Sequence, residues 1–449
     1  MHAKTTSVWT YENGAPEEFS LTRLCDVVDA HFGVKCELVK LAEGGYHKVY
    51  DIIEAGDGVH PGKSLNAVAR VASPAFPRDK LKSEVATLRY IASHTSVPVP
   101  SVSVWNADAS NPVGAEYMIM QKIPGVPAFD NWQTLPVDIK ESVVVQVAEH
   151  LAALFSIRFD KAGSLYCVPS ASKSSSSSVS STASDGYEVG PIVTGPFFHS
   201  LDGILDYPTT DLHTLPSSSS TRLHSLRGPF TGAGDYLAHH LRALLFKCTE
   251  FPKETMRLLD DEDKPKEEPD NEQKRETLQR AERALRKGIQ LCAVYPGDAS
   301  VYPGGPSTPE QPFTLRLDDF RLVNILIDEY TGKVNGYIDF EGTSTAPLWY
   351  AATVPQWIPD PDGDTASWYG GSPADQRRLW GAFHATMARC DAEWRKAYQG
   401  GKPFRAWADH LELGVEAWGS EDVERWVDAR LAWASEEGRR GMAMPESDD

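Results

Sequence analysis

Two short apolar segments, residues 325–327 and 334–338, flank a Glu-Tyr-Thr-Gly sequence at residues 329–332 that is typical of a turn. The pattern predicts a β-hairpin whose first strand is buried. The midpoint between Asn324 and Asp339 falls on Thr331-Gly332, within this turn. The hairpin would therefore bring them side by side at its open end, roughly 5 Å apart.

A third polar residue, Asp319, precedes Asn324 by five positions, in the loop that leads into the first strand. Taken singly, each of these residues could serve only to shape a turn, because Asp and Asn are frequent turn residues. Together they favour another interpretation, since carboxylate and carboxamide oxygens are the hard ligands that Mg²⁺ prefers. We predict a Mg²⁺ site between Asn324 and Asp339, with Asp319 in the adjoining loop.

The composition bounds the class of protein. The chain has 449 residues, 41% of them hydrophobic and 24% charged, as expected of a globular protein with two or three lobes. Its formal charge of −19 argues against non-specific binding of nucleic acid. The six cysteines include no CxxC pair, so neither a zinc site nor a disulfide framework is predicted. No signal peptide or membrane-length apolar run is apparent, and we expect a cytoplasmic protein.

Hydrophobic periodicity predicts three parts: an N-terminal helical segment (1–35), a β-rich lobe (36–123) and a mostly helical lobe (124–449). The predicted helices cover residues 18–32, 79–93, 143–155 and 274–292, and the predicted strands lie within 36–72 and 97–123.

Two segments interrupt the helical lobe. Residues 168–186 are mostly serine, and residues 258–274 are a charged run with prolines. Neither buries enough apolar surface to order itself, so both are predicted to be disordered insertions. The alternative for the serine run is a cluster of regulatory phosphorylation sites.

A glycine pair, Gly44 and Gly45, lies between the strand-like segments 38–41 and 49–53. Glycines there would let backbone N–H groups approach a phosphate, because no Cβ stands in the way. The alternative is an ordinary tight turn. A Walker A loop is excluded, since the chain has no GxxxxGK[ST] sequence there.

Arg70 interrupts an apolar strand, where an unpaired charge is costly. Glu84 lies on the apolar stripe of the predicted helix 79–93. We predict that these two residues pair. The alternative puts Arg70 on the outer face of an edge strand.

With these pieces in this order, the chain resembles the aminoglycoside phosphotransferase and choline kinase superfamily, and in particular fungal proteins with a phosphotransferase enzyme family domain. The resemblance covers roughly residues 38–360. It implies an α+β, protein-kinase-like two-lobed fold that uses ATP and Mg²⁺. It also implies Asp319 as catalytic base and Asn324 and Asp339 as Mg²⁺ ligands.

The resemblance further implies how ATP is held. Arg70 and Glu84 would orient the phosphates, as a strand Lys and a helix Glu do in kinases. Gly44 and Gly45 would cover the phosphates. Backbone groups from Gln121 to Ile123, between the two lobes, would bond the adenine.

Three positions depart from the family pattern. Leu317 stands where the family usually has His, and His47 stands where Asn or Ser is commoner. Arg321 occupies a position often filled by His, where it could act as an auxiliary group on the γ-phosphate or on a nearby carboxylate. None of these changes removes a group that the chemistry needs.

We therefore expect a small-molecule kinase that moves the γ-phosphate of ATP to a hydroxyl group. The alternative is a pseudokinase-like nucleotide-binding protein. A protein kinase is disfavoured, since no Ala-Pro-Glu segment follows Asp339. The net negative charge and the tryptophans that follow residue 345 are compatible with a cationic substrate. Its candidate partners are Glu341, Asp360, Asp362 and Trp357.

Overall fold

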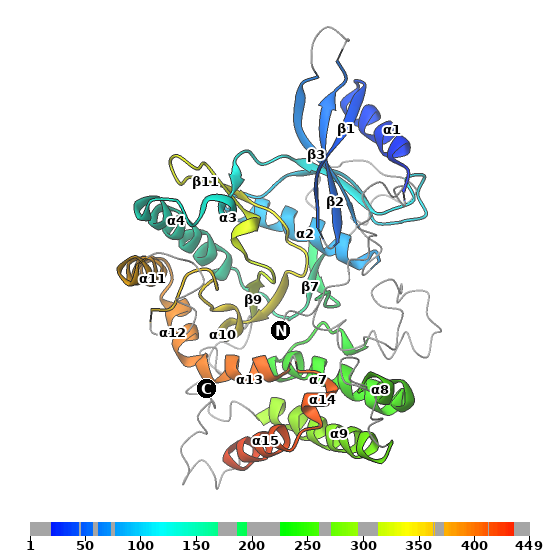
Figure 1. Ribbon diagram of the computed structural model, residues 1–449, viewed down its shortest axis with the longest axis vertical. Helices are drawn as coiled ribbons and strands as arrows, with labels where there is room; N and C mark the ends of the chain where they lie inside the picture. The colour runs from blue at the N-terminus through cyan, green and yellow to red at the C-terminus, as the bar shows by residue number, and fades with distance from the viewer. Residues whose placement is uncertain are drawn as a thin grey trace, which may run out of the picture.

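The computed structural model has a smaller β-rich lobe and a larger, mainly helical lobe, joined near residue 123 (Figure 1). This confirms the expected α+β, protein-kinase-like two-lobed fold. The structure describes residues 19–44, 46–56, 62–72, 77–168, 186–194, 225–259, 271–294, 313–361, 363, 372–411 and 413–434. Most of both predicted insertions, residues 169–185 and 260–270, lies outside these described residues.

The smaller lobe is a five-stranded antiparallel sheet with one helix on each face. Its strands run in the order β1-β2-β3-β5-β4. The elements are α1 (Leu21–Phe32), β1 (Cys36–Glu43), β2 (His47–Glu54), β3 (Ser64–Ala72), α2 (Asp79–His94), β4 (Val102–Asn106) and β5 (Tyr117–Gln121).

Strand β3 shows why this sequence builds a two-faced sheet. Ala69 and Val71 pack with Leu24 of α1, whereas Val68 packs with Leu81 of α2. Side chains alternate between faces along a strand, so Arg70 shares the α2 face with Val68. Strand β3 lies between β2 and β5, and the alternative that placed Arg70 on an edge strand is therefore wrong.

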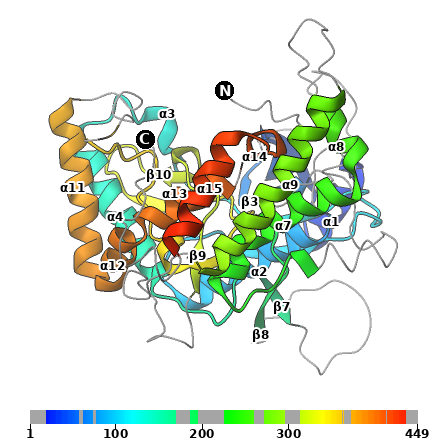
Figure 2. The ribbon, with the colours of Figure 1, turned by 90° about the horizontal axis from the view of Figure 1, so that it is seen from below.

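The larger lobe begins with β6 and its helices pack around a second core. In Figure 2, α7, α9 and α15 lie side by side. The lobe contains β6 (Val126–Pro127), α3 (Ala128–Asn131), α4 (Val137–Phe155), β7 (Ser164–Val168), β8 (Gly186–Gly190), α7 (Ala233–Glu250), α8 (Pro252–Leu258), α9 (Asn271–Val294), β9 (Phe313–Arg316), η2 (Leu322–Asn324), β10 (Ile325–Ile327), β11 (Val334–Tyr337), β12 (Ser344–Pro347), α10 (Leu348–Ala351), α11 (Pro373–Cys390), α12 (Ala392–Gly400), α13 (Lys402–Leu411), α14 (Val415–Trp418) and α15 (Glu421–Ala434).

The predicted hairpin is present, but its register differs by one residue. A bulge at Asn335 on β11 shifts the pairing, so the C=O of Asn324 accepts a hydrogen bond from the N–H of Ile338 at 3.0 Å. Asn324 therefore lies opposite Ile338, and Asp339 follows one position beyond. Strand β10 also pairs with β6, the first strand of the larger lobe, and this pairing attaches the hairpin to the chain segment that follows the junction of the lobes.

A substitution at Gly125 can test the packing at this junction. Gly125 has a φ of +112°, and a Cβ there would collide with the C=O of Ile327 on β10. Gly125→Ala should therefore add a steric cost of about 1–3 kcal/mol to the cost of the backbone conformation. The control is Gly114→Ala, since Gly114 has a φ of +83° and open space around its Cα. Urea unfolding should show the larger loss for Gly125→Ala, and equal losses would contradict this packing.

Candidate active site

The loop between β9 and β10 carries two adjacent aspartates with different surroundings. Asp318 accepts a hydrogen bond from Arg316 at 3.0 Å, and the Arg316 guanidinium lies 4.4 Å from the ring centroid of Tyr350. Gly342 packs against Asp318 so closely that a Cβ there would lie 2.8 Å from its Oδ2. Asp318 is therefore part of the scaffold, which leaves Asp319 as the candidate base.

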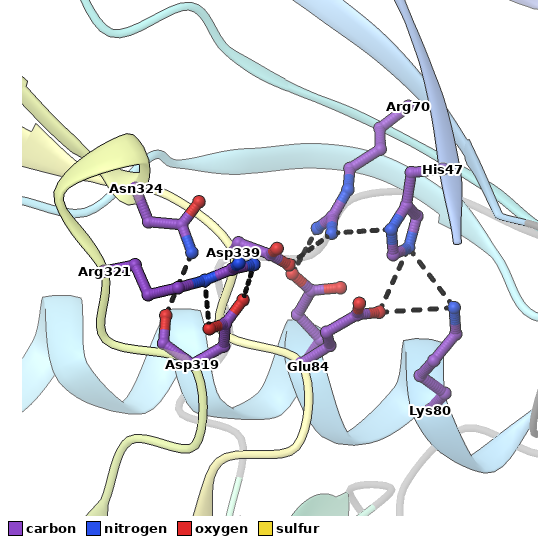
Figure 3. A network of polar contacts seen from close by, with 9 residues as sticks. His47, Arg70, Lys80, Glu84, Asp319, Arg321, Asn324 and Asp339 are labelled. Carbon is purple, nitrogen blue, oxygen red and sulfur yellow. Dashed lines mark hydrogen bonds and ion pairs between the residues drawn. The ribbon is translucent and has the colours of Figure 1, made fainter. Parts of the chain in front are cut away.

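Among the described residues, one side chain, that of Arg321, pairs with the carboxylate of Asp319. Both of its carboxylate oxygens contact Arg321, one of them at 2.5 Å from Nη2 (Figure 3). The Arg321 side chain is 69% exposed and that of Asp319 is 37% exposed. Solvent weakens ion pairs of this kind to about 1 kcal/mol or less, so Arg321 is a group that a ligand can displace.

Asn324 and Asp339 present oxygens from the open end of the hairpin. The Asn324 amide nitrogen donates to the C=O of Asp319 at 2.9 Å, which leaves the amide oxygen as the atom available to a cation. Asp339 has a φ of +68°, a left-handed conformation that non-glycine residues adopt at some cost. Its Oδ1 accepts a hydrogen bond from Arg70 at 2.7 Å.

Arg70 connects the sheet, helix α2 and the hairpin. Its Nη1 donates to Glu84, and its Nη2 lies 2.9 Å from His47 Nδ1 and 2.7 Å from Asp339 (Figure 3). The predicted contact between Arg70 and Glu84 is thereby confirmed, while its role stays a prediction. Burial alone would lower the pKa of Arg70, but Glu84 and Asp339 raise it, so the guanidinium stays charged.

A second cation, Lys80, lies in the same network and was missed by the sequence analysis. Its Nζ lies 3.2 Å from Glu341 Oε2 and 3.5 Å from His47 Nε2. The signal was present in the chain, because Lys80 precedes Glu84 by four positions and so shares its helix face.

The protonation of this network follows from burial and charge. Burial, reinforced by Arg70 and Lys80, holds the pKa of His47 well below its usual value, so its ring is neutral. Burial raises the pKa of Glu341 to about 7, even though Lys80 opposes the shift. Because Arg70 donates to Nδ1 of the neutral His47 ring, the ring proton lies on Nε2.

His47, Asp339 and Glu341 offer ligand atoms that all lie within 4.8 Å of one another. Arg70 and Lys80 already contact these groups, so their charge is balanced without a metal ion. The donor set at the end of the hairpin shares Asp339 with this group and adds Asn324. The amide oxygen of Asn324 and the carboxylate of Asp339 are hard oxygens, and they fit the requirements of Mg²⁺.

The remaining predicted residues are the glycine pair and the adenine contacts between the two lobes. The N–H of Gly44 donates to the C=O of His47 at 2.9 Å and closes the β1–β2 turn, whereas Gly45 lies outside the described residues. The N–H groups of Gln121 and Lys122 are bonded to backbone carbonyls of the sheet lobe. Of the predicted adenine contacts, Ile123 is therefore better placed to offer its N–H than Gln121.

The candidates for a cationic substrate are mostly engaged elsewhere. Trp357 is buried in the core, where its ring lies edge-on to Trp132 at 5.3 Å. Glu341 pairs with Lys80. Asp362 lies outside the described residues. Among the tryptophans that follow residue 345, Trp349, Trp407 and Trp418 are also fully buried.

The chain matches a known family over most of its length. The family model described as "Phosphotransferase enzyme family" covers residues 39–369. That range is well over half of the 449 residues. The chain belongs to the phosphotransferase enzyme family.

Two relatives of the chain are fungal proteins. A protein of Aspergillus fumigatus named as a subtelomeric hrmA-associated cluster protein is 28% identical over 323 residues, which are 71% of this chain. The match covers 60% of that relative, so this chain spans about three fifths of its length. Altered inheritance of mitochondria protein 9 of Candida tropicalis, mitochondrial by name, is 31% identical over 137 residues, covering 29% of this chain and 21% of that protein.

Solved structures with similar chains are aminoglycoside phosphotransferases. A thermostable mutant in ternary complex with AMP-PNP and hygromycin B is 16% identical, with a TM-score of 0.38 and coverage of 94% of this chain and 99% of that one. A second enzyme, in ternary complex with streptomycin and ATP, is 12% identical, with a TM-score of 0.43 and coverage of 90% and 96%. These ligands are those of the two named enzymes.

In the part of the chain that the structure describes, none of the helices combines the length and the apolar character needed to cross a membrane.

The pairing of Arg70 with Glu84 can be tested through stability. Glu84→Ala leaves the buried Arg70 without its strand-to-helix partner and should lower the free energy of unfolding by about 3 kcal/mol or more. The control is Asp422→Ala, which removes the ion pair of Asp422 with Arg425 on the surface of α15. Exposed pairs contribute about 1 kcal/mol or less. Urea unfolding followed by tryptophan fluorescence measures both, and similar losses would exclude a special role for Glu84.

Proposed function

We propose that the protein is an ATP-dependent kinase that transfers the γ-phosphate to a hydroxyl group of a small molecule. The observation that carries the proposal is the convergence of Asp319, Asn324 and Asp339 on one loop and hairpin, tied to the sheet through Arg70. Membership of the phosphotransferase enzyme family supports the same class of reaction.

Asp319 is the proposed base. A carboxylate that accepts a hydrogen bond from the acceptor hydroxyl orients it and takes its proton as the new bond to phosphorus forms. Asp318 is bonded to Arg316 and is not free for this task. Arg321 contacts both oxygens of Asp319, so an acceptor hydroxyl would either share one carboxylate oxygen with that guanidinium or displace one of its arms.

Asn324 and Asp339 are the residues that would hold Mg²⁺. When bound, the ion would neutralise negative charge on the β- and γ-phosphates. The task of this chain is to keep the two oxygens in position. Glu84 fixes Arg70, and Arg70 fixes the carboxylate of Asp339. Gly44 and Gly45 would approach the phosphates, and Ile123 the adenine.

The acceptor is proposed only as a small molecule with a hydroxyl group. A cationic acceptor stays a prediction from the charge of −19. The expected cytoplasmic location also stays a prediction, and one relative carries a mitochondrial name.

The proposed base has a direct test. Asp319→Asn keeps the shape of the side chain but removes its basicity, and should lower kcat by about 10²- to 10⁴-fold. The measurement is transfer of labelled γ-phosphate from ATP to a broad panel of small hydroxyl compounds. Asp328→Asn is the control, since Asp328 caps the turn of the same hairpin at 2.9 Å from the N–H of Thr331. Equal turnover by Asp319→Asn and the unaltered protein would exclude Asp319 as the base.

A second candidate function is nucleotide binding with little or no transfer. Two features favour it: Arg321 contacts both oxygens of Asp319, the proposed base, and Leu317 lacks the hydrogen bonds of the usual family His. ATP would then raise the melting temperature of the protein, and no hydroxyl compound in the panel would be phosphorylated. Transfer to any member of the panel would exclude this candidate.

A further inference from the structure

The guanidinium of Arg70 is already committed to protein groups. Its two terminal nitrogens contact Glu84, His47 and Asp339, and the residue is 5% exposed. An arginine has a rigid planar fork, so it cannot turn towards a new anion without giving up these contacts together. Arg70 is therefore well suited to hold Asp339 in place, and poorly suited to follow a phosphate.

Lys80 is a different kind of cation in the same network. It lies in the first turn of α2, where the helix dipole disfavours positive charge. It is nonetheless buried, with Nζ 5.1 Å from the ring centroid of Tyr46 and 3.2 Å from Glu341 Oε2. In Figure 3 its amine points towards His47.

The contacts of Lys80 use only part of the hydrogen-bonding capacity of its ammonium group. An ammonium group has three N–H donors. Arg70 can only donate to Nδ1 of His47, so the ring proton lies on Nε2, which faces Lys80 at 3.5 Å and cannot accept a hydrogen bond from it. Glu341 is the carboxylate that forms an ion pair with Lys80. A flexible four-carbon stem allows the ammonium to exchange this partner for another anion.

This inference rests on the proposed use of ATP. We propose that Lys80 is the residue that binds the nucleotide phosphates. Its ammonium leaves Glu341 and donates to a phosphate oxygen, while Arg70 stays with Glu84 and keeps Asp339 in position. The family resemblance implied that Arg70, held by Glu84, orients the phosphates. In this proposal Lys80 contacts the phosphates and Arg70 positions Asp339.

The test is a series of ligands that differ only in their phosphates. Isothermal titration calorimetry with adenosine, AMP, ADP and ATP, in the presence of Mg²⁺, compares the unaltered protein with Lys80→Met. A hydrogen bond to a charged group contributes about 1.5–3 kcal/mol, so Lys80→Met should weaken ATP binding by about 10- to 100-fold. Adenosine binding should stay the same, and the first ligand of the series to lose affinity identifies the phosphate that Lys80 contacts.

Two further variants separate this role from a structural one. Lys82→Met makes the same chemical change at an exposed position of α2 and should leave every affinity unchanged. Lys80→Met/Glu341→Gln removes both partners of the buried pair, so it keeps the protein folded where Lys80→Met alone leaves Glu341 without a cation. If Lys80 only balances Glu341, this double variant will bind ATP as the unaltered protein does. The proposal requires that ATP binding stays weak while adenosine binding is normal.

The possible failures are distinct. Failure of the unaltered protein to bind ATP would overturn the proposed function and this inference together. Tight ATP binding by the unaltered protein, by Lys80→Met and by the double variant would overturn only the inference. Equal losses of adenosine and ATP affinity would assign Lys80 a structural role and would also overturn it.

Discussion

The arrangement of the candidate site depends on the buried guanidinium of Arg70. It joins three parts of the chain that are far apart in sequence: the sheet at His47, helix α2 at Glu84 and the hairpin at Asp339. Burying charges is costly, and an ion pair in such surroundings often contributes little net stability. Removing one partner is nevertheless expensive, because the other charge is then buried alone. The contacts of Arg70 therefore fix one relative placement of the lobes more than they stabilise the fold.

That placement distinguishes residues that look alike in the sequence. Asp318 and Asp319 are adjacent, yet the first is bonded to Arg316 and packed against Gly342, whereas the carboxylate of the second pairs with the exposed Arg321. Arg70 and Lys80 are both buried cations, yet Arg70 pairs with two carboxylates, those of Glu84 and Asp339, and Lys80 with that of Glu341. In each pair, the more loosely held member is the one that we propose to engage a substrate.

Local patterns in the sequence predicted most of the fold. The apolar stripe of residues 79–93 predicted helix α2 with Glu84 on its buried side, and the apolar segments around residues 329–332 predicted the hairpin. Its register could not be predicted, because the bulge at Asn335 depends on how β10 packs between β11 and β6. The pairing of Lys80 with Glu341 could not be predicted from the sequence either, because it forms only when the two lobes come together.

The central claim is that Asp339 is held by Arg70 so that it can bind Mg²⁺ at the phosphates of ATP. It can be tested by measuring the dissociation constant of ATP, with and without Mg²⁺, for the unaltered protein and for Asp339→Ala. We expect Mg²⁺ to tighten ATP binding by the unaltered protein, and to have no effect on Asp339→Ala, which should stay folded and lose turnover. Equal tightening by Mg²⁺ in both proteins, with turnover preserved in the variant, would contradict the claim.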